Sequence, residues 1–224
     1  MLQLSDVKAL VLYLFYKLNM EFIQKLFTPY QTYSSFQIGL ELLATITGIA
    51  SVIFAIYKRI WVYPVGIIST VLYTYLLFQW GLYGDMLINA YYTIMSLYGW
   101  WAWLQHDEKA NVENPKQDYI LTQMAFCLIG GFILVLGIYY FKYETFQSIP
   151  FINWIDAICT SIFLVAMFLM ARRRIENWIF WIVGNTIAIY LFYTKGYTIT
   201  SIQFSVFLIL AIIGWYEWRK NKLS

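Results

Sequence analysis

Reactive side chains are scarce in this chain. Its 224 residues include one histidine, His106, in a charged loop, and two cysteines, Cys127 and Cys159, both within apolar stretches. A metal cluster or a histidine-activated nucleophile requires more histidine than this. Two thiols inside apolar segments indicate side-chain packing and no disulfide framework. The sequence therefore argues against a hydrolase, a metalloenzyme or a redox protein, and we expect no catalytic residue, no metal site and no cofactor.

Charge is also scarce. Only 12% of the residues are charged, 61% are hydrophobic, and the formal net charge is +3. No soluble domain could bury that much apolar surface in one core, so the sequence predicts an all-α integral membrane protein. We expect the lipid bilayer as its environment and no nucleic acid as a partner. Aromatic residues make up 21% of the chain, more than interfacial belts usually require, which predicts that some of them line an internal site.

Seven apolar segments each approach the length that a hydrocarbon core of about 30 Å demands of a helix. They lie at residues 37–57, 61–79, 84–104, 119–141, 153–171, 177–194 and 197–218. Residues 1–35 carry too many charges to cross the membrane, but their hydrophobic residues recur at helical spacing. This pattern predicts an amphipathic helix that lies on the membrane surface.

Lys and Arg divide unequally between the two faces that seven spans define. Of the 15 such residues, ten lie on the face that includes the C-terminus and five on the other. Cytoplasmic loops carry the excess of Lys and Arg. The sequence therefore predicts an outer N-terminus and a cytoplasmic C-terminus that ends in a basic tail, 219–224.

The chain aligns with itself at a spacing of about 115 residues. Gly99-Trp-Trp-Ala-Trp103 matches Gly214-Trp-Tyr-Glu-Trp218 at an offset of 115, whereas Trp61 matches Trp178 at an offset of 117. Each repeat contains three spans, and the second copy keeps the orientation of the first only if one further helix intervenes. The fourth span lacks a counterpart and suits that linking role.

These observations predict a 3+1+3 arrangement of parallel repeats, a geometry typical of transporters that hold substrate between two halves. The predicted segments are the interfacial segment 1–35, the first three-helix repeat 36–104, the polar loop and linker helix 105–141, the second repeat 151–218 and the tail 219–224. At the offset of 117, Ile68 aligns with Asn185, so the amide belongs to the second repeat alone.

Polar side chains at membrane depth mark a candidate binding site. In a helix over 177–194, Trp178, Trp181 and Asn185 share one stripe. Burying an unpaired amide costs roughly 2–7 kcal/mol, so Asn185 should face a partner helix or a water-filled cavity. Packing between helices is the alternative for each amide. The candidate substrate-binding residues are Trp181, Asn185, Asn89, Gln79, Tyr92, Trp178 and Gln203.

The middle third of every predicted span lacks Asp, Glu, Lys and Arg. A proton relay or sodium site built on buried charge is thus missing, as is a Walker-type nucleotide loop, which favours a facilitator over a pump. A retinal-type sensor is disfavoured because the last span has no Lys. Amides and hydroxyls suit a sugar, aromatic side chains suit a flat cationic ring, and phosphate would require Arg or Lys. The pattern favours a nucleoside-like cation without phosphate.

Trp178-x-x-Trp181-x-x-x-Asn185, the paired Gly-Trp-x-x-Trp-like span ends and the 3+1+3 layout resemble the PnuC family of vitamin transporters over about residues 36–220. The resemblance implies a SWEET-like fold, a trimer in the bacterial inner membrane, and import of nicotinamide riboside by facilitated diffusion. It also implies a cytoplasmic kinase that phosphorylates and so traps the riboside. Within the family, Trp181 and Asn185 are expected at the substrate, with Asn89 and Gln79 next. A thiamine carrier, or another vitamin or sugar carrier on the same fold, remains the alternative, since thiamine is also a flat cation.

Overall fold

The structure is a computed structural model that describes residues 20, 33–80, 83–105, 117–196 and 198–223. Within these residues it contains seven α-helices and one short 3₁₀ helix. They are α2 (Ser35–Ile56), α3 (Val62–Gln79), α4 (Tyr83–Leu104), α5 (Gln117–Tyr143), η2 (Phe146–Ser148), α6 (Phe151–Ala171), α7 (Asn177–Thr194) and α8 (Thr198–Leu223). The amphipathic helix predicted within 1–35 lies outside the described residues.

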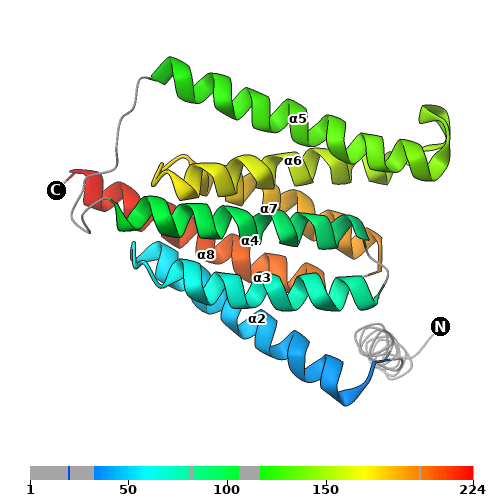
Figure 1. Cartoon of the computed structure of the whole chain (residues 1–224), viewed down its shortest axis with the longest axis horizontal. Coiled ribbons are helices and arrows are strands. Elements are labelled where there is room, and N and C mark those ends of the chain that lie inside the picture. Colours follow the sequence, from blue (N-terminus) through cyan, green and yellow to red (C-terminus); the bar gives the residue numbers. More distant parts are fainter. Residues whose placement is uncertain (1–19, 21–32, 81–82, 106–116, 197, 224) are drawn as a thin grey trace, which may run out of the picture.

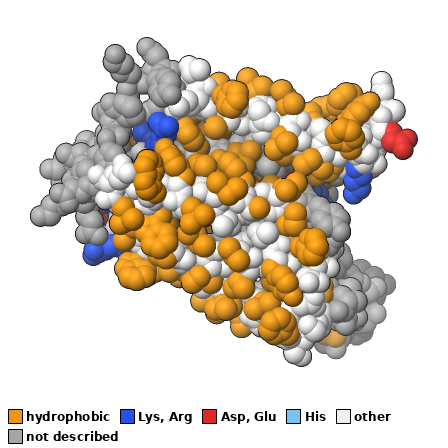
Figure 2. All heavy atoms as spheres, in the orientation of Figure 1, with side chains coloured by type: hydrophobic (Ala, Val, Ile, Leu, Met, Phe, Trp, Pro, Cys, Tyr) orange, Lys and Arg blue, Asp and Glu red, His pale blue; other side chains and the backbone are white. Residues whose placement is uncertain are grey.

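Five of these helices are long and apolar enough to cross a membrane by length and composition, namely α2, α3, α6, α8 and the part of α5 from Leu121 onward. The other two predicted spans are α4 and α7, which carry the candidate residues Asn89, Tyr92, Trp181 and Asn185. Their amides and aromatic side chains make these helices less apolar. Figure 2 shows hydrophobic side chains along the whole visible face, with charged side chains towards its ends.

Six of the helices form a closed ring. Each packs on the next in the order α2, α3, α4, α6, α7, α8, and α8 packs back on α2. α5 packs on α6 from outside the ring, and Figure 1 shows α5 and α2 at opposite edges of the bundle. The joins α4–α6 and α8–α2 therefore connect the half that precedes α5 to the half that follows it.

The helix ends contain local signals that fit their boundaries. At the start of α2, the Gln37 backbone N–H donates to Ser34 Oγ at 3.2 Å, and the Ser34 backbone N–H donates to Gln37 Oε1 at 2.9 Å, forming a capping box. The turns after α2 and α6 place Lys58 and Arg173 in the left-handed region, both at φ 54°. A positive φ is uncommon for residues other than glycine, and here it recurs 115 residues apart.

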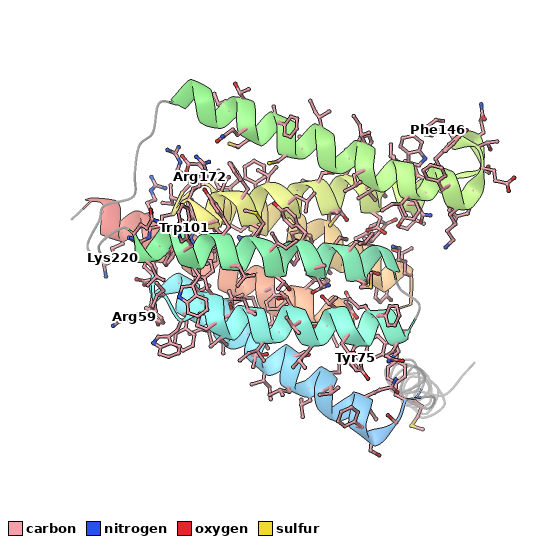
Figure 3. All side chains as sticks on the ribbon, viewed as in Figure 1. Arg59, Tyr75, Trp101, Phe146, Arg172 and Lys220 are labelled. Carbon is pink, nitrogen blue, oxygen red and sulfur yellow. The ribbon has the colours of Figure 1, made fainter. Side chains whose placement is uncertain are left out.

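One end of the bundle gathers most of the basic side chains. Figure 3 places Arg59, Arg172 and Lys220 at this end, and Tyr75 and Phe146 towards the other. We define the basic end by Lys58, Arg59, Arg172, Arg173, Arg174, Arg219 and Lys220.

Two edge-to-face aromatic pairs stand at the basic end, one in each half. Tyr63 of α3 lies 5.1 Å from Trp103 of α4 at an interplanar angle of 87°. Trp178 of α7 lies 5.7 Å from Trp218 of α8 at 82°. Edge-to-face contacts of this kind add about 0.5–1.5 kcal/mol beyond area burial. The two pairs occupy positions 115 residues apart, so the halves pack in the same way.

Each of these pairs depends on a glycine in the neighbouring helix. A Cβ at Gly99 would lie 2.4 Å from the Tyr63 ring, and a Cβ at Gly214 would lie 2.5 Å from the Trp178 ring. Real Cβ atoms do not approach so closely. The two glycines, also 115 residues apart, let the rings lie directly against a helix backbone.

The structure corrects the sequence alignment in one helix. Trp178 takes the place of Tyr63 in these contacts, two residues beyond Trp61, with which the sequence aligned it. Both ends of α7 also lie 115 residues after the ends of α3. Asn185 therefore corresponds to Thr70, and the offset of 117 in this helix was wrong by two residues.

Basic side chains cross between the halves at the basic end. Lys58 Nζ lies 5.5 Å from the ring centroid of Trp218, and Arg173 Cζ lies 4.4 Å from that of Trp103. Trp218 Nε1 donates to the Ala55 carbonyl at 3.0 Å, and Arg173 Nη2 donates to the Trp103 carbonyl at 3.2 Å. Burial and the nearby Arg173 charge lower the pKa of Lys58 from its ordinary value. Cation–π contacts contribute about 0.5–2 kcal/mol each, so these crossed contacts hold the halves together at this end.

Candidate substrate-binding site

Several contacts cross the interior of the ring between helices that are not neighbours in it, and two of them involve candidate residues. Tyr73 of α3 meets Gln203 of α8, with the Tyr73 hydroxyl 3.5 Å from both Oε1 and Nε2 of the amide. Tyr92 of α4 meets Trp181 of α7 at a centroid distance of 6.3 Å. Both contacts join the first half to the second. They identify the ring interior as the place where candidate residues from both halves converge.

Hydroxyl groups of the first half form a paired polar network around Tyr73. Its hydroxyl lies 2.7 Å from Thr45 Oγ1 on α2. One helix further along, Thr93 Oγ1 of α4 donates to Thr70 Oγ1 of α3 at 2.8 Å. A carboxamide offers two donors and two acceptor positions, so the long contacts of Gln203 with Tyr73 leave much of its hydrogen-bonding capacity unused.

Aromatic side chains dominate the second half of the interior. Phe163 of α6 lies 5.4 Å from Trp181 and stacks on Phe204 of α8 at 5.8 Å and 14°. Phe192 of α7 stacks on the other side of Phe204 at 5.1 Å and 16°. We call these four residues, with Tyr92, the aromatic wall. Its rings come from α4, α6, α7 and α8 and supply the flat apolar surface that an aromatic ligand would contact.

Asn185 carries the most informative polar group of the interior. Its side chain is only 2% exposed, yet no hydrogen bond joins it to any residue that the structure describes. One turn away, the buried Trp181 Nε1 likewise has no partner among the described residues. Burying an amide without a hydrogen-bond partner costs roughly 2–7 kcal/mol of free energy. These groups are therefore available to hydrogen-bond a ligand.

Asn89 lies on the same face of α4 as Tyr92, one turn away. Its Nδ2 donates to the Asp85 carbonyl of its own helix at 2.9 Å. Its Oδ1 accepts no hydrogen bond from the described part of the chain. Because α4 and α7 run in opposite directions, moving one turn from the Tyr92–Trp181 contact towards the non-basic end reaches Asn89 on one helix and Asn185 on the other.

Two of the predicted site residues lie elsewhere. Trp178 is 1% exposed and packs on Trp218 at the basic end, with its Nε1 buried and without a partner among the described residues. Gln79 is exposed at the last residue of α3. Of the remaining five, Tyr92 and Trp181 are in contact, and Asn89 and Asn185 each lie one turn from that contact on the same two helices. Gln203 instead meets Tyr73 of α3.

Phe163 and Phe204 were missed from the sequence. A phenylalanine in an apolar helix has no pattern that distinguishes a wall residue from a lipid-facing one. At the structural offset of 115, however, Phe163 corresponds to Gly48 and Phe204 corresponds to Asn89. This asymmetry between the halves was the signal that could have identified them.

The chain is similar to known membrane transporters. The sequence profile of the family described as nicotinamide mononucleotide transporter matches residues 38–220. The chain is 25% identical over 202 residues to the nicotinamide riboside transporter PnuC of Escherichia coli strain K12, covering 80% of this chain and 84% of that protein. It is 26% identical over 188 residues to the protein of the same name from Neisseria mucosa, covering 79% and 70%.

A more distant relative and a solved structure extend the likeness. The riboflavin/roseoflavin transporter RibM of Streptomyces davaonensis is 21% identical over 178 residues, covering 80% of this chain and 83% of that protein. The crystal structure of the vitamin B3 transporter PnuC has a TM-score of 0.58 at 21% identity and covers 82% of each chain, which shows a shared fold. Because the profile extends from within α2 to within α8, the chain belongs to the nicotinamide mononucleotide transporter family.

Proposed function

We propose that this protein imports nicotinamide riboside across the bacterial inner membrane by facilitated diffusion. The observation that carries the proposal is Asn185, which is 2% exposed and makes no hydrogen bond to a described residue, one turn from Trp181, whose buried Nε1 has no partner there either. An amide of this kind can bond ribose hydroxyls or the nicotinamide carboxamide. The aromatic wall would accept the pyridinium ring, since a cation over an aromatic face gains about 0.5–2 kcal/mol.

The interior favours the riboside over the mononucleotide that the family description names. Recognition of a phosphate uses Arg or Lys. Five of the six ring helices contain neither residue, and α8 has them only near its end, from Arg219 onward. Lys195 follows α7, and its Nζ is held by Asp156 at 2.7 Å. A phosphorylated ligand would find no free basic partner among the described interior residues.

The proposed transport mechanism is a change in the angle between two parallel three-helix repeats, with α5 as their linker in a 3+1+3, SWEET-like arrangement. The aromatic pairs, the glycines and the positive-φ turns that recur 115 residues apart support this arrangement. The crossed contacts of Lys58 and Arg173 would close the path at the basic end while it opens at the other. Acidic residues of the ring helices lie near helix ends, which fits a carrier without an ion site.

Import would be sustained by a cytoplasmic kinase that phosphorylates the riboside. The anionic product would not return, because the interior offers no basic partner for phosphate. By the same family resemblance we propose a homotrimer.

Uptake into proteoliposomes tests the proposed activity. Purified protein should admit labelled nicotinamide riboside without ATP or an ion gradient, until the inner and outer concentrations are equal. Nicotinamide mononucleotide should not compete, since the interior lacks a phosphate partner. Saturable thiamine uptake without nicotinamide riboside uptake would overturn this proposal in favour of the thiamine carrier.

The proposed orientation of the chain in the membrane can be tested separately. If the basic end faces the cytoplasm, as the distribution of Lys and Arg favours, a reporter that fluoresces only in the cytoplasm should be active when fused after Ser224. A reporter that is active only outside the cytoplasm should be inactive at that position. The opposite pair of signals would place the basic end outside.

A further inference from the structure

One carboxylate near the proposed site belongs to none of the ion pairs that the described residues form. Asp85 lies in the first turn of α4 and is half-buried. Its carboxylate makes no hydrogen bond and no ion pair within the part of the chain that the structure describes. Lys195, which follows α7 at the same end of the bundle, is engaged elsewhere: its Nζ lies 2.7 Å from Asp156, which also accepts a hydrogen bond from Tyr139 at 2.5 Å.

The position of Asp85 relates it to the substrate path. Asp85, Asn89 and Tyr92 follow one stripe of α4 by steps of four and three. At 1.5 Å per residue, Asp85 lies about 6 Å from Asn89 along the helix, on the side away from the basic end. A molecule that reached Asn89 and Asn185 from that side would pass Asp85 first.

We propose that Asp85 selects for a cationic substrate at the outer side of the site. The inference rests on the proposed function, because nicotinamide riboside carries a fixed positive charge on its pyridinium ring. A carboxylate attracts that charge most strongly where protein shields it from water. It gives no advantage to a neutral ring of the same shape. Asp85 therefore acts as a specificity-determining residue in addition to the aromatic wall and the amides.

Because Asp85 lies in the first turn of α4, it can also stabilise the helix, and this effect must be distinguished from charge selection. Asp near the N-terminus of a helix stabilises it through the helix dipole. Loss of that effect would weaken the fold and lower the affinity for every ligand alike. Loss of charge selection would instead lower affinity for the cation alone.

The test uses two ligands that differ in charge and share one skeleton. Binding of nicotinamide riboside and of its neutral dihydro form is measured on wild-type protein, Asp85→Asn and the charge-retaining Asp85→Glu. We expect Asp85→Asn to weaken binding of the cation about tenfold. An effect of this size is expected when one partly shielded charge near a cationic ligand is removed. Binding of the neutral form should be unchanged, and Asp85→Glu should retain most of the preference for the cation.

The outcomes separate the two hypotheses. An equal loss for both ligands in Asp85→Asn, or no loss for either, would overturn charge selection and leave the proposed function standing. Wild-type protein that binds neither ligand would overturn the proposed function itself. Melting temperatures of the three proteins show whether a change in binding reflects a change in folding.

Discussion

Asn185→Leu is expected to lose about tenfold in affinity for the substrate while the protein keeps or gains thermal stability. Hydrogen bonds between protein and a polar ligand contribute about 0.5–1.5 kcal/mol each, and a loss of 1.4 kcal/mol weakens binding tenfold. The same substitution removes a buried amide that has no partner among the described residues, which is destabilising in the empty protein. Binding measurements and melting temperatures on one preparation check both directions.

Thr186→Ala is the matched control for that substitution. Thr186 is the next residue of α7, but it is exposed and its hydroxyl donates to the Ile182 carbonyl of its own helix at 2.8 Å. Its removal should leave affinity unchanged. Wild-type affinity in Asn185→Leu would show instead that the amide serves packing between helices and not the substrate.

Gly214→Ala should lower the melting temperature by several degrees. The added Cβ would lie 2.5–2.6 Å from three ring atoms of Trp178. This ring is buried and held edge-to-face against Trp218, so it has little room to yield. Overpacking of this kind costs typically about 1–3 kcal/mol. Thermal unfolding of the detergent-solubilised protein measures the effect, and Gly99→Ala should act in the same direction through Tyr63.

A helical glycine without neighbours supplies the control. A Cβ at Gly130 of α5 would meet no atom within 4 Å, and alanine is favoured over glycine in a helix by up to about 1 kcal/mol. Gly130→Ala should therefore leave the melting temperature unchanged or raise it. Equal melting temperatures for Gly130→Ala and Gly214→Ala would contradict the close approach of Trp178 to α8.

The positions of the helices were largely predictable from the sequence. Apolar length predicted seven helices, and each predicted span lies largely within one helix of the structure. Length and composition alone mark five of them as membrane-crossing. Helices α4 and α7 deviate because amide and aromatic side chains such as Asn89, Tyr92, Trp181 and Asn185 lower their apolar content.

The register of the repeat was predictable only in part. Local similarity at the span ends gave the offset of 115 correctly, because Gly99 and Gly214 are each fixed by contact with a ring. In α7 the match of Trp178 to Trp61 was misleading, since the packing position is filled by tyrosine in one half and tryptophan in the other. A large ring can be exchanged for another without a change in packing, so residue identity aligned the wrong pair.

Composition and apolar length predict the membrane setting and the helices, and the cost of burying polar groups singles out the two interior amides, Asn89 and Asn185. Which residues of a helical stripe meet one another depends on the packing of the helices. The tertiary structure places Trp181 in the aromatic wall with Phe163 and Phe204 and packs Trp178 against Trp218, although both tryptophans share a face of α7. The physical reason is that periodicity fixes the direction of a side chain about its own helix, whereas the neighbours it meets depend on its depth along that helix and on the order of helices in the ring.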